Sequence, residues 1–187
     1  MQELKQYLEQ YLAIAEKDWQ YIQSQLLLEQ GEKGDILTKQ GHVENHLYFL
    51  CSGVARLFHE GDEKDITVNF GFPFEFISAY SSFLLNKKSN FMLQLLTPST
   101  FIKISRESLE DIYIHTSCGH HFGRILTEKI VLYLSKRETS FMLRSPTERY
   151  LDLFEEHPRL IQEIPQKYLA SYIGITPQAL SRIRAKL

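Results

Sequence analysis

The stretch "LASYIGITPQALSRIRAKL", residues 169–187, determines how the C-terminal part of the chain folds. Apolar residues recur in it at helical spacing, but Gly174 and Pro177 interrupt the pattern only three residues apart. A glycine supplies the positive φ of a sharp turn, and a proline is tolerated at the first position of a helix. We therefore predict a helix over about Pro165–Tyr172, a turn at Gly174, and a second helix that begins at Pro177 with Thr176 as its cap.

The side chains of this stretch fit two helices that pack against each other. Five apolar residues are expected to form the small core between them, and Ala170 lets the helices approach closely: Leu169, Ile173, Ile175, Leu180 and Ile183. Residues 165–187 carry four basic and no acidic side chains, which leaves 17 basic and 23 acidic residues, a net charge of −6, for the rest of the chain. This combination predicts a helix-turn-helix whose second helix suits a DNA major groove, and a generic helix pair fits it less well.

Length and composition are those of an ordinary folded protein. The 187 residues allow one domain or two small ones, and 43% of them are hydrophobic. The chain has no apolar run long enough for a transmembrane helix, and its N-terminus lacks the pattern of a secretory signal. With Cys51 and Cys118 as its only cysteines, a disulfide framework is not expected, and a cytoplasmic location is.

In the segment before the helix-turn-helix, the spacing of apolar residues changes twice. Residues 1–30 have the periodicity of one or two helices, whereas residues 31–105 consist of short apolar runs separated by turns every 8–12 residues, as in a β-sandwich or β-barrel. A short helix is predicted over about 105–114 and a long one over about Ser117–Leu143. A further helix begins near Ser145 or Thr147 and ends near Pro158.

The long helix carries an apolar stripe with two possible partners. Leu126, Ile130 and Tyr133 alternate at spacings of four and three, and Arg137 comes next in the same register. Such a stripe between two domains either pairs with its copy in a second chain or packs on the β-unit of its own chain. The sequence leaves both possibilities open.

With these residues in view, the chain resembles the Crp/Fnr family of bacterial transcription regulators. "GEKGDILTKQGHVENHLYFLCSGVARLF" is similar to the opening strands of that family, with Gly31, Gly34, Gly41 and Gly53 at turns, and "ERYLDLFEEHP" is similar to the helix that leads into its DNA-binding unit. "IPQKYLASYIGITPQALSRIR" is especially similar to short members from Bacteroidetes-type bacteria.

The resemblance implies an α+β fold in three parts: an antiparallel β-roll (jelly roll) sensor domain of the cyclic-nucleotide-binding type with flanking helices over 1–115, a long central dimerisation helix over 116–143, and a helix-turn-helix domain over 144–187. It implies a homodimer that is not an enzyme and that reads a palindromic operator. Double-stranded DNA and RNA polymerase are the partners it implies.

The region that holds cyclic AMP in the family departs from the family pattern. Glu75 matches its acidic residue, but Phe74 stands where the family has glycine, and Lys88, Ser89 and Asn90 replace an Arg-Ser-Ala run. A lysine presents a point charge instead of a two-pronged guanidinium, so the exchange alters phosphate binding. Glu75 and residues 88–90 are therefore the candidate effector pocket, with an unknown effector that is not expected to be cyclic AMP. A cyclic-nucleotide-responsive regulator is the alternative.

The second helix of the helix-turn-helix also departs from the family, because Pro177 and Gln178 replace an Arg-Glu pair. Gln178, Ser181 and Arg182 are the candidates for base readout, since glutamine pairs with adenine and arginine with guanine. Four further residues are candidates for phosphate contacts: Thr176, Lys167, Arg184 and Lys186. The β-hairpin wing of the family is expected to be reduced or absent, unless the C-terminus is trimmed, because the connection over 157–165 is short.

Two groups of histidines raise the possibility of a metal site. "HTSCGHH" contains His115, Cys118, His120 and His121, whose spacing matches no common zinc pattern. "HVENH" places His42, Glu44 and His46 at two-residue spacing, which allows a cupin-like metal-dependent enzyme as a less favoured alternative. A second cupin motif is missing, and we expect these three residues to flank an exposed turn. No metal, other cofactor or catalytic residue is therefore predicted.

Overall fold

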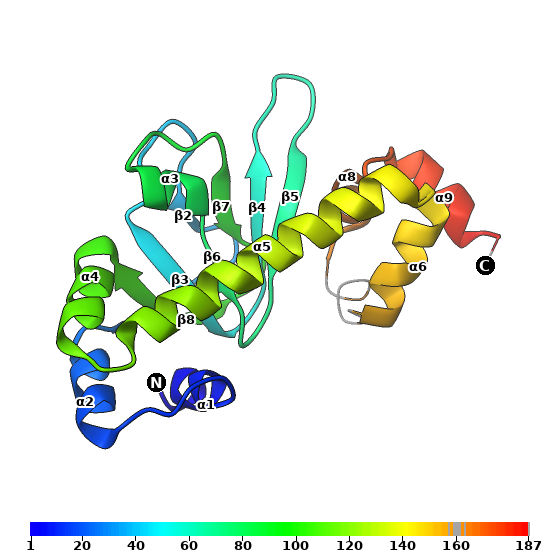
Figure 1. Cartoon of the computed structure of the whole chain (residues 1–187). Helices are drawn as coiled ribbons and strands as arrows, with labels where there is room; N and C mark the ends of the chain where they lie inside the picture. Colours follow the sequence, from blue (N-terminus) through cyan, green and yellow to red (C-terminus); the bar gives the residue numbers. More distant parts are fainter. Residues whose placement is uncertain (157, 159–161, 163, 187) are drawn as a thin grey trace.

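The computed structural model describes residues 1–156, 158, 162 and 164–186, and it shows a β-roll flanked by helices. Two helices, α1 (Gln2–Glu9) and α2 (Glu16–Ser24), come first. The roll itself contains β1 (Leu27–Gly31), β2 (Ile36–Thr38), β3 (His46–Ser52), β4 (Ala55–His59), β5 (Ile66–Gly71), β6 (Phe76–Ile77), α3 (Tyr80–Leu85), β7 (Met92–Leu95) and β8 (Ser99–Ser105). The helices α4 (Arg106–His115), α5 (Gly119–Leu143), α6 (Pro146–Glu156), α8 (Gln166–Ile173) and α9 (Pro177–Arg184) follow. The predicted α+β class is confirmed (Figure 1).

The strands form two four-stranded antiparallel sheets, in the orders β1-β8-β3-β6 and β2-β7-β4-β5. Strands that are distant in sequence pair in both sheets, as in the pairing of β3 with β8. Apolar side chains from the two sheets meet between them in a common core. Gly34, Gly41 and Gly53 adopt the positive φ expected at turns, whereas Gly31 is the last residue of β1 and has no positive φ.

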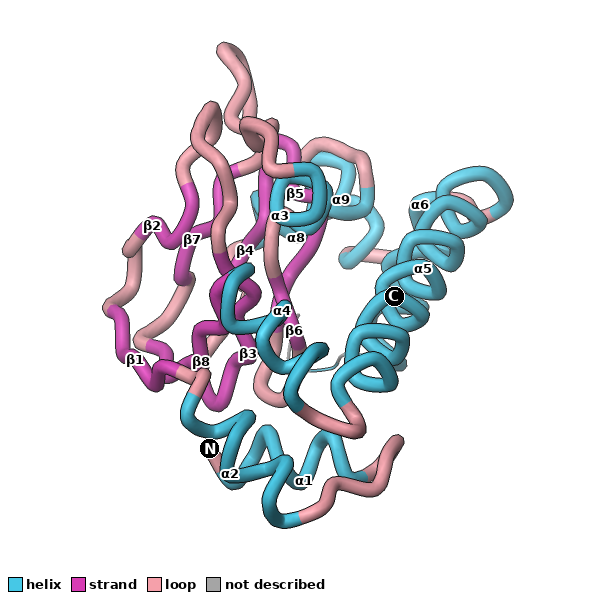
Figure 2. The backbone as a smooth tube through the Cα atoms, turned by 60° about the vertical axis from the view of Figure 1, so that its left-hand side comes forward, coloured by secondary structure: helices cyan, strands magenta, loops and turns pink. Residues whose placement is uncertain are grey.

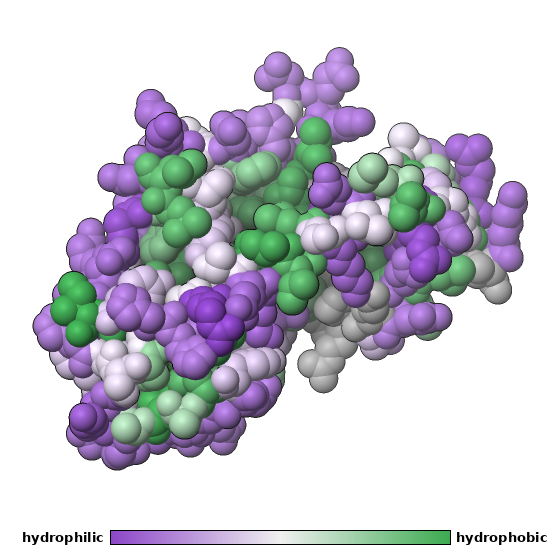
Figure 3. All heavy atoms as spheres, in the orientation of Figure 1, coloured by the Kyte–Doolittle hydropathy of each residue, from purple (hydrophilic) through white to green (hydrophobic). Residues whose placement is uncertain are grey.

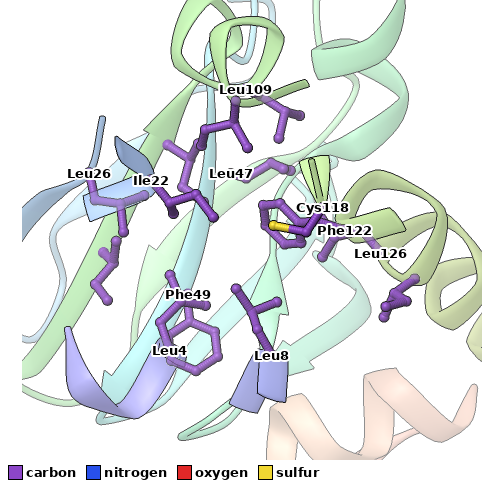
Figure 4. Close-up of a cluster of buried hydrophobic side chains, with 14 of the residues drawn as sticks. Leu4, Leu8, Ile22, Leu26, Leu47, Phe49, Leu109, Cys118, Phe122 and Leu126 are labelled. Carbon is purple, nitrogen blue, oxygen red and sulfur yellow. The ribbon is translucent and has the colours of Figure 1, made fainter. Parts of the chain in front are cut away.

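A second core joins the N-terminal helices to the roll. Leu4 and Leu8 of α1 lie beside Phe49 of β3, and Phe122 at the start of α5 belongs to the same cluster (Figure 4). Cys118 is buried in this cluster as well, so it acts as a packing residue. The cluster anchors the first turns of α5, and thereby fixes the direction in which the helix leaves the roll.

The predicted stripe of α5 packs within its own chain. Leu126 is buried in the core beneath α1. The Tyr133 hydroxyl donates to the carbonyl oxygen of Val68 at 3.1 Å, and Arg137 donates to the carbonyl oxygens of Thr67 and Tyr172 at 3.3 and 3.1 Å. These residues of the stripe therefore pack on the β-roll and on the end of α8, whereas pairing of α5 with a second chain stays a prediction.

The C-terminal helices share a core with the β-roll. Leu169, Ile173 and Leu180 are buried as predicted, and Ile175 and Ile183 pack against them. Val54 and Phe70 of the roll belong to the same cluster, so α8 rests on β5 (Figure 2). The division of the chain at residues 115 and 143 stays a prediction. The predicted helix end near Pro158 and the connection over 157–165 fall largely outside the described residues.

Candidate nucleic-acid interface

The turn between α8 and α9 has the geometry that its sequence predicts. Gly174 has a φ of +78°, and its N–H donates to the carbonyl oxygen of Ser171 at 3.1 Å. The Ile175 N–H donates to the carbonyl oxygen of Ala170, which closes the end of α8. Thr176 caps α9, because its Oγ1 accepts from the N–H of Ala179 at 3.2 Å. The turn thus orients α9 rigidly relative to α8.

The end of α5 packs directly against this turn. A Cβ placed on Gly174 would lie 2.8 Å from Cε1 of Phe141, which is closer than side chains tolerate. The guanidinium groups of Arg137 and Arg149 lie 4.9 and 4.7 Å from the centre of the same ring. Arg149 also donates to the carbonyl oxygen of Ile173 at 3.0 Å. Sequence reasoning missed this contact, because nothing in the pattern of α5 indicates where its last turn lies.

The three residues predicted to read bases share one face of α9. Gln178, Ser181 and Arg182 are exposed and lie three and four positions apart, so they project from the same side of the helix. Leu180 on the opposite side is fully buried. This places a glutamine amide and a guanidinium on a free helical surface, as base readout requires.

Gln166 at the start of α8 contacts this face and was not predicted. Its Nε2 donates to Oγ of Ser181 at 2.7 Å and to the carbonyl oxygen of Pro177 at 3.4 Å. The bond ties the first turn of α8 to the middle of α9. It also fixes the orientation of the Ser181 hydroxyl. The pairing of these two polar residues depends on the crossing of the helices, which sequence spacing does not give.

The residues predicted to contact phosphate are all exposed: Thr176, Lys167, Arg184 and Lys186. The Lys167 ammonium lies 4.8 Å from the centre of the Tyr168 ring, so its stem runs along α8. The capping bond of Thr176 uses the oxygen as acceptor and leaves the hydroxyl hydrogen for another partner. The basic charge of the C-terminal segment is thus presented to solvent.

A buried arginine joins the β-roll to α8. Arg56 of β4 is 1% exposed and lies between the rings of Phe58 and Tyr168, 4.0 and 3.8 Å from their centres. Its Nε donates to Oγ1 of Thr67 and its Nη1 to Asp65, while the buried Nη2 has no partner among the described residues. Burial lowers the pKa of this guanidinium. The sequence could have indicated this burial, because Arg56 is the one charged residue within the apolar run "GVARLF".

Ser171 of α8 extends this connection to the edge strand of the sheet. Its Oγ donates to the carbonyl oxygen of Asp65 and accepts from the N–H of Thr67, each at 2.9 Å. α8 therefore satisfies backbone groups of β5 that would otherwise face solvent at the sheet edge. The position of the helix-turn-helix on the roll is fixed by side chains from both units.

The predicted effector-pocket residues fall into two separate groups. Glu75 is half-buried between β5 and β6, where it accepts from the N–H of Phe72, and burial raises the pKa of its carboxyl group. Ser89 is buried, whereas Lys88 and Asn90 are exposed in the segment that pairs with the turn at His42. No contact joins Glu75 to this segment within the described chain. Their joint role as a pocket stays a prediction.

Phe74, where the sequence resemblance expects a glycine, has an unusual backbone conformation. Its φ is +68°, a region that bulky side chains rarely adopt, and its side chain is 51% exposed. Its N–H donates to the carbonyl oxygen of Leu50 at 2.7 Å, which holds the turn in place.

The groups considered as metal ligands do not converge. Among the described residues, no cluster of three or more His, Cys, Asp or Glu side chains is placed to hold a metal ion. Glu44 corrects one expectation, because it is 1% exposed instead of flanking an open turn. It accepts from Thr38 and from the N–H of His46, and burial raises its pKa. This buried carboxyl group therefore links β2 to β3 by hydrogen bonds, whereas His42 is exposed.

Comparison with known proteins finds a domain family that matches the β-roll. Residues 28–115 match the family described as the cyclic nucleotide-binding domain. The chain is 22% identical over 174 residues to the potassium channel GORK of Arabidopsis thaliana, a match that covers 81% of this chain. This chain spans one fifth of the length of that channel (20%). In the described part of the chain, no helix has the length and apolar character needed to cross a membrane.

Solved structures extend the likeness to most of the chain. FixK2 of Bradyrhizobium japonicum has a TM-score of 0.74 at 14% identity, over 87% of this chain and 84% of that one. A protein of Eubacterium rectale described as a transcriptional regulator of the crp/fnr family has a TM-score of 0.71 and is 16% identical, over 97% of this chain and 87% of its own. CLP of Xanthomonas campestris, described as a c-di-GMP responsive global regulator, has a TM-score of 0.69 and is 17% identical, over 92% of this chain and 91% of its own.

These findings define the class of the protein as a cyclic nucleotide-binding domain fold followed by a long helix and a helix-turn-helix. Within that class, the chain has the fold of the Crp/Fnr transcription regulators, so the predicted resemblance to this family is confirmed; the likeness to short members from Bacteroidetes-type bacteria stays a prediction.

Proposed function

We propose that the protein is a homodimeric transcription regulator that binds a palindromic operator through α9 and acts with RNA polymerase in the cytoplasm. The observation that carries the proposal is the α9 face. Gln178, Ser181 and Arg182 are exposed side by side on a capped helix whose other side is buried. Exposed basic residues flank that face, as a helix in the major groove requires for phosphate contacts.

The dimer is supported by an apolar face of α5 that the chain itself does not cover. Val131, Leu134 and Met142 are exposed and fall on one side of the helix, away from the stripe that packs on the roll. Leu84 and Leu85 of α3 are exposed as well. Apolar side chains gather over α3 and along α5 on the same face of the molecule (Figure 3). A second copy packed along α5 would cover this surface and place two α9 helices about a two-fold axis.

Selection of a random DNA library on the purified protein tests the proposal. We expect enrichment of a two-fold symmetric site with half-sites about one helical turn apart. Light scattering is expected to give the mass of a dimer. Enrichment of an asymmetric site, or no enrichment in the presence and absence of cyclic AMP, would contradict the proposed mode of binding.

Two variants separate base readout from phosphate contact. Arg182→Ala should weaken binding to the selected site by about 1–3 kcal/mol and relax the preference at one base position. Lys186→Ala should weaken binding to all sequences alike and flatten the dependence on salt. Fluorescence anisotropy with the selected site and with a scrambled duplex gives both quantities. Equal losses on both duplexes for both variants would show that Arg182 does not read a base.

Cyclic AMP titration distinguishes the alternative of a nucleotide-responsive regulator. Lys88, Ser89 and Asn90 replace the arginine-containing run of the cyclic-AMP-binding relatives, so we expect equal DNA affinity with and without the nucleotide. Binding that appears only after cyclic AMP is added would favour the alternative.

A further inference from the structure

A hollow of about 680 Å³ lies between the C-terminal half of α5, the first half of α6 and the end of α8. It lies at the junction of the long helix and the C-terminal unit, where α6 folds back from the end of α5 (Figure 1). Leu132, Phe141 and Leu153 give it apolar walls, and Tyr172 contributes to the lining. Its volume falls within the range of sites that hold small molecules.

The charge around the hollow is unbalanced. Arg144 is neutralised, because its guanidinium lies 3.8 Å from Glu148 and 4.0 Å from Asp152. Arg137 and Arg149 also line the hollow, and neither has a carboxylate partner among the described residues. Within the described residues, both guanidinium groups contact backbone carbonyl oxygens and the ring of Phe141, and Arg137 also lies 4.1 Å from the centre of the Tyr172 ring.

The two unneutralised guanidinium groups act on each other. Both lie within 5 Å of the Phe141 ring centre, and the pKa of Arg149 is lowered by burial and by the charge of Arg137. Like charges in a partly buried setting repel each other, and an anion bound in the hollow would reduce that repulsion and offer a charge-assisted hydrogen-bond partner. Each guanidinium has five N–H donors, so the carbonyl contacts do not exhaust them.

We propose that this hollow binds a small organic anion with an apolar body, whose acidic group lies between Arg137 and Arg149 and whose body lies against Phe141 and Leu153. The apolar walls and the uncompensated charge both belong to one cavity, and together they match an amphipathic anion better than an inorganic ion. The site is distinct from the candidate effector pocket in the β-roll, and the proposal does not depend on DNA binding.

Fluorescence titration with 8-anilinonaphthalene-1-sulfonate, an aromatic anion, tests the site on the full chain. We expect saturable binding of one probe per chain. Decanoate should displace the probe, and decanol at the same concentration should not, because it lacks the charge. Arg149→Gln is expected to weaken probe binding about tenfold or more, since it removes a charge-assisted contact. Arg124→Gln, which removes an exposed guanidinium outside the hollow, serves as the control and should bind like the unmodified protein.

A second variant keeps the test decisive if Arg149→Gln fails to fold. Thr139→Trp adds bulk to an exposed lining position and leaves both arginines in place, and it should abolish saturable binding. The proposal is overturned if decanol competes as well as decanoate, or if the probe binds Thr139→Trp unchanged. Displacement of the probe by duplex DNA as effective as that by decanoate would also overturn it, since the arginines would then form a phosphate-backbone surface. Probe affinity that rises as a dimer dissociates would show that a second copy fills the hollow, which overturns the proposal as well.

Discussion

Replacing Gly174 by alanine should destabilise the fold by about 1–3 kcal/mol, and the structure divides this cost into two parts. The φ of +78° costs a residue with a Cβ about 1–2 kcal/mol. The new methyl group would also meet Cε1 of Phe141 at 2.8 Å; because this ring is 42% exposed and can move, the second part should cost only up to about 1 kcal/mol. The first part belongs to the turn alone, whereas the second depends on the end of α5.

A double-mutant cycle with Phe141→Leu separates the two parts. Urea unfolding gives the free energy of each variant, and far-ultraviolet circular dichroism confirms that each is folded. In the Phe141→Leu background, Gly174→Ala should cost only the backbone part, about 1–2 kcal/mol. The same cost in both backgrounds would refute the reasoning, because it would show that α5 does not press on the turn.

Three further predictions address the cap, the buried arginine and the buried carboxyl group. Thr176→Ala should lower the free energy of unfolding by about 1 kcal/mol and Thr176→Ser should not, as measured by urea unfolding; equal losses would assign the effect to the methyl group rather than to the capping bond to Ala179. Arg56→Ala should lower the free energy of unfolding by about 2–4 kcal/mol, because it leaves a cavity. Arg56→Met fills that space and should change the free energy of unfolding by only about 1 kcal/mol, because the buried Nη2 has no partner among the described residues. A large loss in the methionine variant would show that the bonds to Asp65 and Thr67 dominate. Burial raises the pKa of Glu44 in the folded chain, so its contribution to stability is present below the unfolded pKa, about 4.3, and is lost as the pH rises through the folded pKa. Urea unfolding should therefore show that the stability of the unmodified protein relative to Glu44→Gln falls as the pH rises above the unfolded pKa, and a difference independent of pH would contradict the raised pKa.

Local signals in the sequence were enough to predict helices on both sides of a β-unit and the turn of the helix-turn-helix. Gly174, Thr176 and Pro177 each act through the backbone of their own or adjacent residues, so their roles do not depend on distant contacts. The strand rhythm of residues 31–105 likewise predicted a β-unit, which the two sheets confirm. The expectation of an open turn at Glu44 was wrong, because a charged residue in a turn is normally exposed and its burial depends on partners from β2 and β3.

The sequence by itself determined the capped turn, the basic charge on the last helix and the order of strands and helices, because each of these depends on spacing along the chain. Only the tertiary structure decided what the stripe of α5 packs against, where Arg56 is buried and which residues surround the hollow at the end of α5. These features join segments up to about a hundred residues apart, as Ser171 and Asp65 do. Such pairings depend on how two faces dock, and a residue's own neighbours in the sequence do not encode that geometry.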